Sequence, residues 1–325
     1  MPRQVDTGHA FEFAFARELS TWVLQHDADA ELVENEACLR SRRSYESFPE
    51  SERAKYDKAA QLQFPTLSRL EPGLLHAKDA SDKLFISLAG DAMGIAGDVR
   101  DVIMYRKDAC GNRTWEIGVS AKNNNDATKH SRLSEDIRFG EKWMGMDTSS
   151  EYIVSVREVF DWMRQKCAMG CATWASLGVE KETRVYVPLL EAFITEMKRL
   201  FECDHTMAAQ RLIMYLIGRK PFYKVIKNDR DNTSILKVFN FVPGLGKTYN
   251  GFSPGCRPQS IPLPTRCVEM DFVDGGQRNT VSIIMDKGWQ IDFRIHSASK
   301  RIETSLKFDV RLEGNPPALF TQHMF

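Results

Sequence analysis

The sequence predicts an α/β protein with a small mixed core wrapped by helices and a β-rich C-terminal region. Helical periodicity dominates the first third, where AFEFAFARELSTWVLQ places Phe11, Phe15 and Leu19 on one helix face. Two β-type runs between residues 101 and 122 are followed by further helical patterns. From about residue 219 onward, short β-type runs alternate with Asn, Asp, Gly and Pro.

The remaining elements are expected in chain order. Helical patterns continue after the first helix, at residues 27–45 and 51–64, and the apolar run KLFISLAG then predicts a strand. DVIMY and WEIGVSAK flank the turn-rich segment KDACGNR, so together they predict a β-hairpin. We expect helices again from His130 and at residues 150–167 and 188–216.

The last third is expected to form an antiparallel β region. Its strands are predicted by FYKVIK, ILKVFNF, TRCVEMDFV, TVSIIM, WQIDFRIH and SLKFDVRL. The predicted boundary near residue 218 separates a helical part with the mixed core, residues 1–218, from a β-rich part, residues 219–325. These parts are expected to be two lobes, or one integrated domain.

Composition places the chain among ordinary globular proteins. It has 325 residues, of which 42% are hydrophobic and 27% charged. No run of 18 or more apolar residues predicts a membrane span, and the N-terminus lacks a secretory signal pattern. The seven cysteines are odd in number and irregularly spaced, as is typical of a reduced chain. The sequence therefore predicts a cytoplasmic protein.

The balance of charges argues against one class of nucleic-acid-binding protein. The 44 basic and 44 acidic residues cancel, which argues against a protein that coats nucleic acid by bulk attraction. An enzyme that acts on DNA remains compatible with this balance, because it needs basic residues only along one cleft.

The predicted hairpin carries the residues best suited to chemistry. Alternation in WEIGVSAK places one set of side chains towards the core, namely Trp115, Ile117, Val119 and Ala121. The other face holds Glu116, Gly118, Ser120 and Lys122. Only glycine and serine separate the carboxylate from the ammonium, so we expect room there for a metal ion or a phosphate. The alternative is a surface hairpin with a solvated charged face.

Two aspartates precede this face on the neighbouring strand. Asp98 and Asp101 are separated by an odd number of positions, so only one can share the face with Lys122, and the strand register decides which. Carboxylates bind Mg²⁺, and the metal acidifies water and offsets phosphate charge. A nearby lysine can position the water and contact the phosphate. The pattern therefore predicts a metal-dependent phosphodiester hydrolase.

The hairpin resembles the active site of the PD-(D/E)xK nuclease superfamily. Gly97-Asp98 or Arg100-Asp101 stands in the "PD" place, and Ser120-Ala121-Lys122 in the "(D/E)xK" place. Serine departs from the usual acid, and the resemblance implies that the acid comes from elsewhere. Two glutamates compete for this role, Glu116 on the strand and Glu135 in the following helix. Glu12 resembles the accessory helix glutamate of these nucleases, or is a partly exposed helix residue.

Several segments together resemble the HaeIII family of type II restriction endonucleases. They are GDVRDVIM, WEIGVSAKNNN, KHSRLS and FRIHSASKRIETSLKFDVRL, and the match covers most of the chain. The resemblance implies Mg²⁺-dependent cleavage of double-stranded DNA at a short palindrome, GGCC. It also implies a DNA methyltransferase as a functional partner, and a palindromic site favours a homodimer.

Donor-rich residues near these motifs are candidates for DNA binding. Guanines are best read by Arg or Lys, and phosphates by basic and amide side chains. Near the hairpin the candidates are Asn123, Asn124, Lys129, His130 and Arg132, and near the C-terminus they are Arg294, His296, Lys300 and Arg301. Two alternatives remain: a repair or structure-specific nuclease of the same superfamily, and a catalytically dead DNA-binding module.

Overall fold

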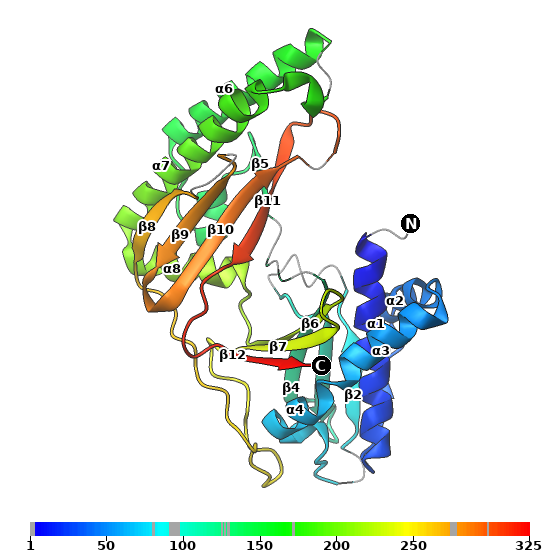
Figure 1. The fold of residues 1–325 in the computed structure, drawn as a ribbon. Coiled ribbons are helices and arrows are strands. Elements are labelled where there is room, and N and C mark those ends of the chain that lie inside the picture. Colours follow the sequence, from blue (N-terminus) through cyan, green and yellow to red (C-terminus); the bar gives the residue numbers. More distant parts are fainter. Residues whose placement is uncertain are drawn as a thin grey trace. The chain divides into compact units, whose positions relative to one another are not determined.

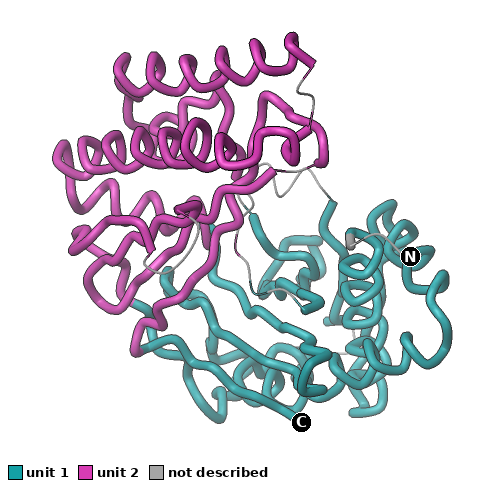
Figure 2. Tube along the Cα trace, turned by 45° about the horizontal axis from the view of Figure 1, so that its top comes forward, with its two compact units in different colours: residues 1–126, 218–261, 318–325 teal, residues 127–217, 262–317 magenta. Residues whose placement is uncertain are grey.

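The computed structural model describes residues 4–79, 82–90, 98–124, 126, 128, 131–170, 173–273, 278–297 and 299–325. The chain divides into two compact units (Figure 2). Unit 1 comprises residues 1–126, 218–261 and 318–325, and unit 2 comprises residues 127–217 and 262–317. The chain passes from unit 2 to unit 1 between residues 217 and 218, and the β-rich part that follows is shared between the two units.

Unit 1 contains a mixed seven-stranded sheet, ordered β1-β2-β3-β4-β6-β7-β12 (Figure 1). The predicted hairpin is confirmed, because β3 and β4 pair antiparallel, whereas β4 and β6 pair parallel. The strands are β1 (Ala30–Leu32), β2 (Leu84–Leu88), β3 (Val102–Lys107), β4 (Arg113–Asn123), β6 (Phe222–Asn228), β7 (Thr233–Phe239) and β12 (Phe320–Met324).

Among the described residues of unit 1, four helices and a short 3-10 turn accompany this sheet. They are α1 (Gln4–Gln25), α2 (Glu36–Glu46), α3 (Glu50–Gln61), α4 (Phe64–Leu70) and the turn Pro72–Leu74. The predicted apolar face of α1 is fully buried, with Phe11, Phe15 and Leu19 at 0% exposure. These side chains belong to one hydrophobic core with Ile117, Val119 and other residues of the sheet. Each such side chain contributes roughly 2 to 3 kcal/mol by burial, so α1 is firmly attached to β4.

Unit 2 packs helices against an antiparallel sheet ordered β5-β11-β10-β9-β8. Phe293 and Phe308 of the sheet meet Phe193 of α7, with ring centroids 5.2 Å apart in both pairs. The strands are β5 (Ser131–Ser134), β8 (Cys267–Phe272), β9 (Thr280–Met285), β10 (Trp289–His296) and β11 (Ser305–Leu312). The helices are α6 (Ser150–Ala168), α7 (Val187–Cys203), α8 (His205–Leu216) and short segments at Gly140–Met144, Trp174–Leu177, Lys181–Tyr186 and Asp286–Gly288.

The expectation of a mixed sheet flanked by helices is confirmed. The β-rich C-terminal region is divided, because β6, β7 and β12 join the mixed sheet, and β8 to β11 form a second, antiparallel sheet with β5. The helix expected from His130 is wrong for the residues that follow it, since Ser131–Ser134 form a strand paired with β11. Burial alternates along these four residues, and Leu133 lies fully inside the core. Pairing with a strand about 175 positions away in sequence therefore overrides the local helical pattern, as is common for short segments.

Other differences are local. The pattern at residues 188–216 is two helices, because Asp204 ends α7 and its carboxylate accepts a hydrogen bond of 2.9 Å from the Met207 amide at the start of α8. The region 27–45 holds β1 before α2.

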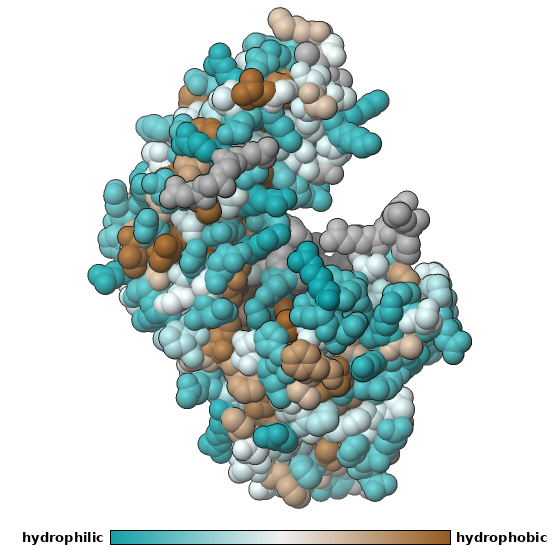
Figure 3. Space-filling view, viewed as in Figure 1, coloured by the Kyte–Doolittle hydropathy of each residue, from teal (hydrophilic) through white to brown (hydrophobic). Residues whose placement is uncertain are grey.

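Polar side chains cover most of the face in Figure 3, with hydrophobic residues in small separate patches. No helix in the described ranges is both long enough and apolar enough to cross a membrane.

Candidate active site

Asp101 is the aspartate that the strand register places beside Lys122. Val102, the first residue of β3, pairs with Val119 of β4, so Asp101 lies next to the end of β4. The Asp101 Oδ2 atom accepts hydrogen bonds from Ser120 Oγ at 3.0 Å, the Ala121 amide at 2.9 Å and Lys122 Nζ at 2.8 Å. The serine in the "(D/E)xK" place therefore fixes the aspartate through a hydrogen bond.

This pair is electrostatically coupled and partly buried. Burial raises the pKa of Asp101, and the nearby Glu12 carboxylate adds to this effect, while Lys122 opposes it. Burial by itself lowers the pKa of Lys122, but the carboxylates of Asp101 and Glu12 outweigh burial and raise it. Lys122 is therefore a cation at neutral pH, suited to donate hydrogen bonds and to attract a phosphate.

Glu12 reaches this site from helix α1. Its side chain is 16% exposed, and its Oε2 atom lies 3.1 Å from His9 Nδ1 on the preceding turn. The Glu12 carboxylate is close enough for its negative charge to raise the pKa of both Asp101 and Lys122. Because α1 packs its apolar face into the core shared with β4, the position of Glu12 is set by the fold and not by a flexible segment.

The carboxylate oxygens of Asp101 and Glu12 are suitable ligands for Mg²⁺, and water and substrate would supply its remaining ligands. All three hydrogen bonds to Asp101 end on Oδ2, and the described residues donate none to Oδ1. Across the described ranges, no group of three or more His, Cys, Asp or Glu side chains could hold a metal. Mg²⁺ is commonly held by one or two carboxylates together with water and substrate phosphate, so two are sufficient.

Asp98 belongs to a separate ion-pair network. Arg100 donates two hydrogen bonds to the Asp98 carboxylate, from Nε at 2.7 Å and from Nη2 at 2.6 Å. Its Nη1 atom donates a third, of 2.8 Å, to Glu116 Oε1. Arg113 also pairs with Glu116, and Lys220 Nζ lies 3.3 Å from Asp98 Oδ2. Burial disfavours the charged Asp98 carboxylate, but Arg100 and Lys220 outweigh burial and lower its pKa. Asp98 and Glu116 are thus both engaged by arginine.

Gly118 makes room for an arginine side chain. A Cβ atom at this position would lie 2.2 Å from Cδ of Arg100, which crosses the strand there. The expectation that Gly118 leaves space for a metal or a phosphate is therefore wrong at this position. The small residue is needed because Arg100 must pass over β4 to reach Glu116 while it holds Asp98.

Glu135 lies in unit 2, in the turn that follows β5 and not on a helix. Its Oε2 atom accepts a hydrogen bond of 2.8 Å from Arg164 Nη1. The structure thus brings together Asp101, Ser120, Lys122 and Glu12. It pairs Glu116 and Glu135, the two glutamates proposed to replace the missing acid, with arginines.

The candidates for DNA binding fall into three groups. Asn123 and Asn124 lie at the end of β4 and hold it to β6, because Asn123 Oδ1 accepts from Lys227 at 3.3 Å and Asn124 Oδ1 accepts from the Asp229 amide at 2.7 Å. Lys129 and His130 lie outside the described residues. The others are in unit 2: Arg132, Arg294, His296, Lys300 and Arg301.

The polar face of the sheet in unit 2 gathers three of these basic residues and adds one that sequence reasoning missed. His296 pairs with Lys307, which in turn pairs with Arg132, so the three side chains form a row across β10, β11 and β5. Arg294 is exposed on the same face, two positions from His296. Lys307 is the missed residue. The alternation in SLKFDVRL could have found it, since Leu306 and Phe308 on either side are buried.

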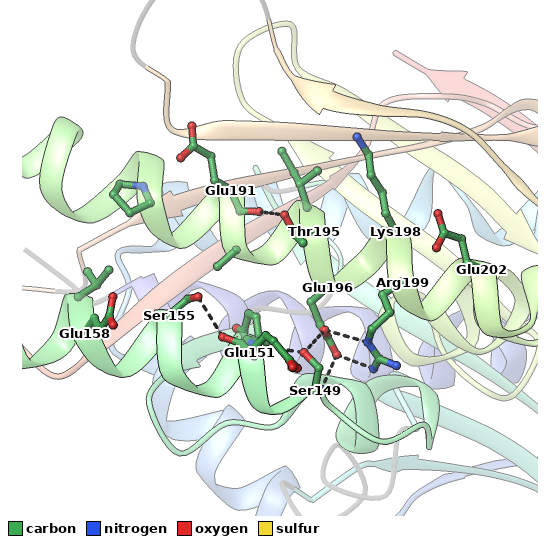
Figure 4. A pocket seen from close by; sticks show the side chains of 15 residues that line it. Ser149, Glu151, Ser155, Glu158, Glu191, Thr195, Glu196, Lys198, Arg199 and Glu202 are labelled. Atoms are coloured by element: carbon green, nitrogen blue, oxygen red, sulfur yellow. Dashed lines mark hydrogen bonds and ion pairs between the residues drawn. The ribbon is translucent and has the colours of Figure 1, made fainter.

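A groove on unit 2 contains none of the predicted site residues. It runs between α6 and α7, and its lining includes five glutamates against one lysine and one arginine (Figure 4). Within it, Glu196 of α7 accepts a hydrogen bond of 2.6 Å from Ser149 Oγ at the start of α6, and one of 2.7 Å from Arg199 Nη2 on α7 itself. These contacts stabilise the helix pair, and the negative charge around them does not suit a DNA backbone.

Comparison with known proteins identifies relatives over nearly the whole chain. The model of the HaeIII restriction endonuclease family matches residues 8–316. The chain is 34% identical over 314 residues to the Type II restriction enzyme HaeIII of Haemophilus aegyptius, covering 97% of this chain and 95% of that enzyme. No solved structure matches. The family resemblance predicted from the hairpin and the C-terminal segments is confirmed, and the chain belongs to the HaeIII family of type II restriction endonucleases.

Proposed function

We propose that this chain hydrolyses phosphodiester bonds in double-stranded DNA at a short palindrome, GGCC, and requires Mg²⁺. We assign its unit 1 to the PD-(D/E)xK nuclease fold. The observation that carries the proposal is the meeting of Asp101 and Lys122 at the end of β4, 2.8 Å apart, in a chain of this family. The 34% identity to an enzyme named for type II restriction supports the same activity.

Each residue of the site has a distinct proposed role. Asp101 and Glu12 hold the metal through carboxylate oxygens, and Ser120 and the Ala121 amide fix the orientation of Asp101. When bound, Mg²⁺ supplies an acidified water and offsets the phosphate charge. Lys122 donates hydrogen bonds to the attacking water and to the phosphate, which its positive charge attracts.

We assign Glu12 the role of the acid that Ser120 does not supply. A neutral hydroxyl that donates to Asp101 cannot replace a carboxylate as a strong metal ligand. Glu116 and Glu135 are the alternatives, but each is held by arginine, which would compete with a metal for the same oxygens. The negative charge of Glu12 raises the pKa of both Asp101 and Lys122, which means that its carboxylate lies near them. Glu12 is therefore the better candidate.

DNA reading is proposed for the open polar face of the sheet in unit 2. Arg132, Lys307 and His296 form a row of donors there, and Arg294 is exposed on the same face. Arg and Lys donate to guanine O6 and N7, which a GGCC site presents in both half-sites. Because the site is palindromic, we propose that two copies act as a homodimer. A DNA methyltransferase that modifies the same sequence is the proposed functional partner, and the cytoplasm, where host DNA lies, is the proposed location.

A digest of DNA of known sequence tests the function. With Mg²⁺, the protein should cut only at GGCC, and mapping the fragment ends reveals the site. Cutting without sequence preference would favour a repair or structure-specific nuclease, and binding without cutting would favour an inactive module. Lys122→Ala is expected to abolish cutting with the fold and DNA binding retained. If Lys122→Ala cut like the wild type, the proposed active site would be wrong.

A further inference from the structure

A second basic cluster lies beside the proposed active site on the same sheet. Lys224 of β6 pairs in register with Ser120 of β4, and Lys237 of β7 pairs with Lys224, so the three side chains lie side by side on one face. Both lysine side chains are largely buried, with 6% and 12% exposure. Lys224 is also close enough to Lys122 for the two charges to repel. The positive charge of the site therefore continues across the sheet.

One carboxylate, that of Asp126, holds both lysines. Its Oδ1 atom lies 2.7 Å from Lys224 Nζ, and its Oδ2 atom pairs with Lys237 Nζ. Lys224 Nζ also donates to the Asp126 carbonyl at 2.8 Å. Two ammonium groups thus share the carboxylate of Asp126. The two acceptor oxygens lie where two oxygens of a phosphate would satisfy both lysines.

We propose that Lys224 and Lys237 form a binding subsite for a DNA backbone phosphate next to the cleavage site, and that the Asp126 carboxylate occupies this subsite in the DNA-free protein. The inference rests on the proposed function. The Asp126 side chain is 46% exposed, so it can turn towards solvent when a phosphate takes its place. Lys224 then keeps its bond to the Asp126 carbonyl, so its ammonium stays in position.

Burial explains why the two lysines are paired with a carboxylate in the DNA-free protein. Burial lowers the pKa of Lys224, because the charged ammonium is poorly solvated there, and Asp126 opposes this effect. A carboxylate from the adjoining segment therefore stabilises the two lysines in the free protein, and a phosphate can take over this role. A backbone phosphodiester can replace the carboxylate, since it also presents two unesterified oxygens and one negative charge, and it resides in a polyanion.

The same strand offers a matched control. Lys227 is also buried and also paired with an aspartate, Asp229. It lies on the opposite face of β6 from Lys224, over the ring of Tyr56 on α3. Lys227→Met and Asp229→Asn therefore remove comparable ion-pair partners away from the face of Lys224. Both residues bond to Asn123 or Asn124 and so hold the end of β4 to β6, and we expect these variants to change stability and to leave the salt slope of DNA binding unchanged.

The test measures binding of wild type and variants to a GGCC duplex in Ca²⁺, as a function of salt concentration. Lys237→Met should weaken binding and reduce the slope of log affinity against log salt by about 0.9, the value for one lost phosphate contact. Lys237→Arg should keep the slope. Asp126→Asn should bind several-fold more tightly than wild type, since no carboxylate then competes. Thermal unfolding of each variant establishes that it is folded.

Equal slopes for Lys237→Met and Lys227→Met would overturn the subsite. Weaker binding by Asp126→Asn than by Asp229→Asn would overturn the competition, and would mean that Asp126 only holds the segment after β4. Failure of the wild type to bind or cut the duplex would instead overturn the proposed function. The two kinds of failure are thus distinguished by the wild-type measurement.

Discussion

The assignment of the two aspartates makes the sharpest prediction. Asp101→Asn and Asp98→Asn each remove one negative charge from the same short segment, yet the structure places them in different networks. Asp101→Asn should reduce the cleavage rate about a thousandfold and preserve folding. Asp98→Asn should reduce stability, and the folded fraction should still cleave DNA.

The loss of stability expected for Asp98→Asn follows from the burial of its ion pair. Asp98 and Arg100 are 8% and 4% exposed, and breaking a buried pair costs about 3 to 5 kcal/mol. We expect about 3 kcal/mol, the lower end of that range, because Glu116 still pairs with Arg100 and asparagine keeps one oxygen acceptor. For a chain of 325 residues, that loss lowers the melting temperature by roughly 4 °C, because the unfolding entropy is about 2.1 cal/mol/K per residue.

For Asp101→Asn the effect falls on catalysis. Asparagine can still accept bonds from Ser120 and the Ala121 amide, so the end of β4 keeps its geometry. Removing the charge also removes the repulsion from Glu12. The rate should fall on the order of a thousandfold, as when one electrostatic group of an active site is lost.

Single-turnover cleavage of a GGCC duplex with Mg²⁺, normalised to folded protein, measures the rate, and thermal unfolding measures stability. Binding to the same duplex in Ca²⁺ should remain largely intact for Asp101→Asn. The reverse pattern, with a stable but inactive Asp98→Asn and an active Asp101→Asn, would refute the assignment from strand register.

Three further predictions concern neighbouring positions. Gly118→Ala should destabilise the protein by about 1 to 3 kcal/mol, because its Cβ would overlap Arg100, and an unchanged denaturation midpoint would contradict this. Glu12→Gln should reduce cleavage at least tenfold and raise the Mg²⁺ concentration needed for half-maximal rate, whereas the same change at Glu135 should have little effect on either. Lys307→Met should weaken binding to GGCC DNA in Ca²⁺, and equal loss with an unrelated duplex would assign Lys307 to phosphate contact instead of base reading.

Local patterns in the sequence were sufficient for several features. Alternation in WEIGVSAK correctly separated the buried Ile117 and Val119 from the face that carries Lys122. The turn-rich segment between the two runs correctly predicted the hairpin. These features could be predicted because they depend on neighbours within a few positions, whose periodicity and turn chemistry are visible in one chain.

Long-range pairing explains two differences between the predicted and the observed arrangement. Ser131–Ser134 form a strand because β11 pairs with them, although their local pattern favoured a helix. FYKVIK and ILKVFNF were correctly predicted as strands, but β6 joins the first sheet beside β4 and so brings Lys224 next to Ser120. Neither pairing leaves a local signal in the segment that it changes.

The sequence by itself determined that Lys122 lies on a polar strand face near two candidate aspartates. Only the tertiary structure decided that Asp101 is its partner, because a hairpin register depends on how both strands pack and not on either strand alone. The structure also decided that Gly118 accommodates Arg100, and that Glu12 on a helix more than a hundred positions away acts on Lys122. Such contacts are set by the burial of a shared core, which no local pattern encodes.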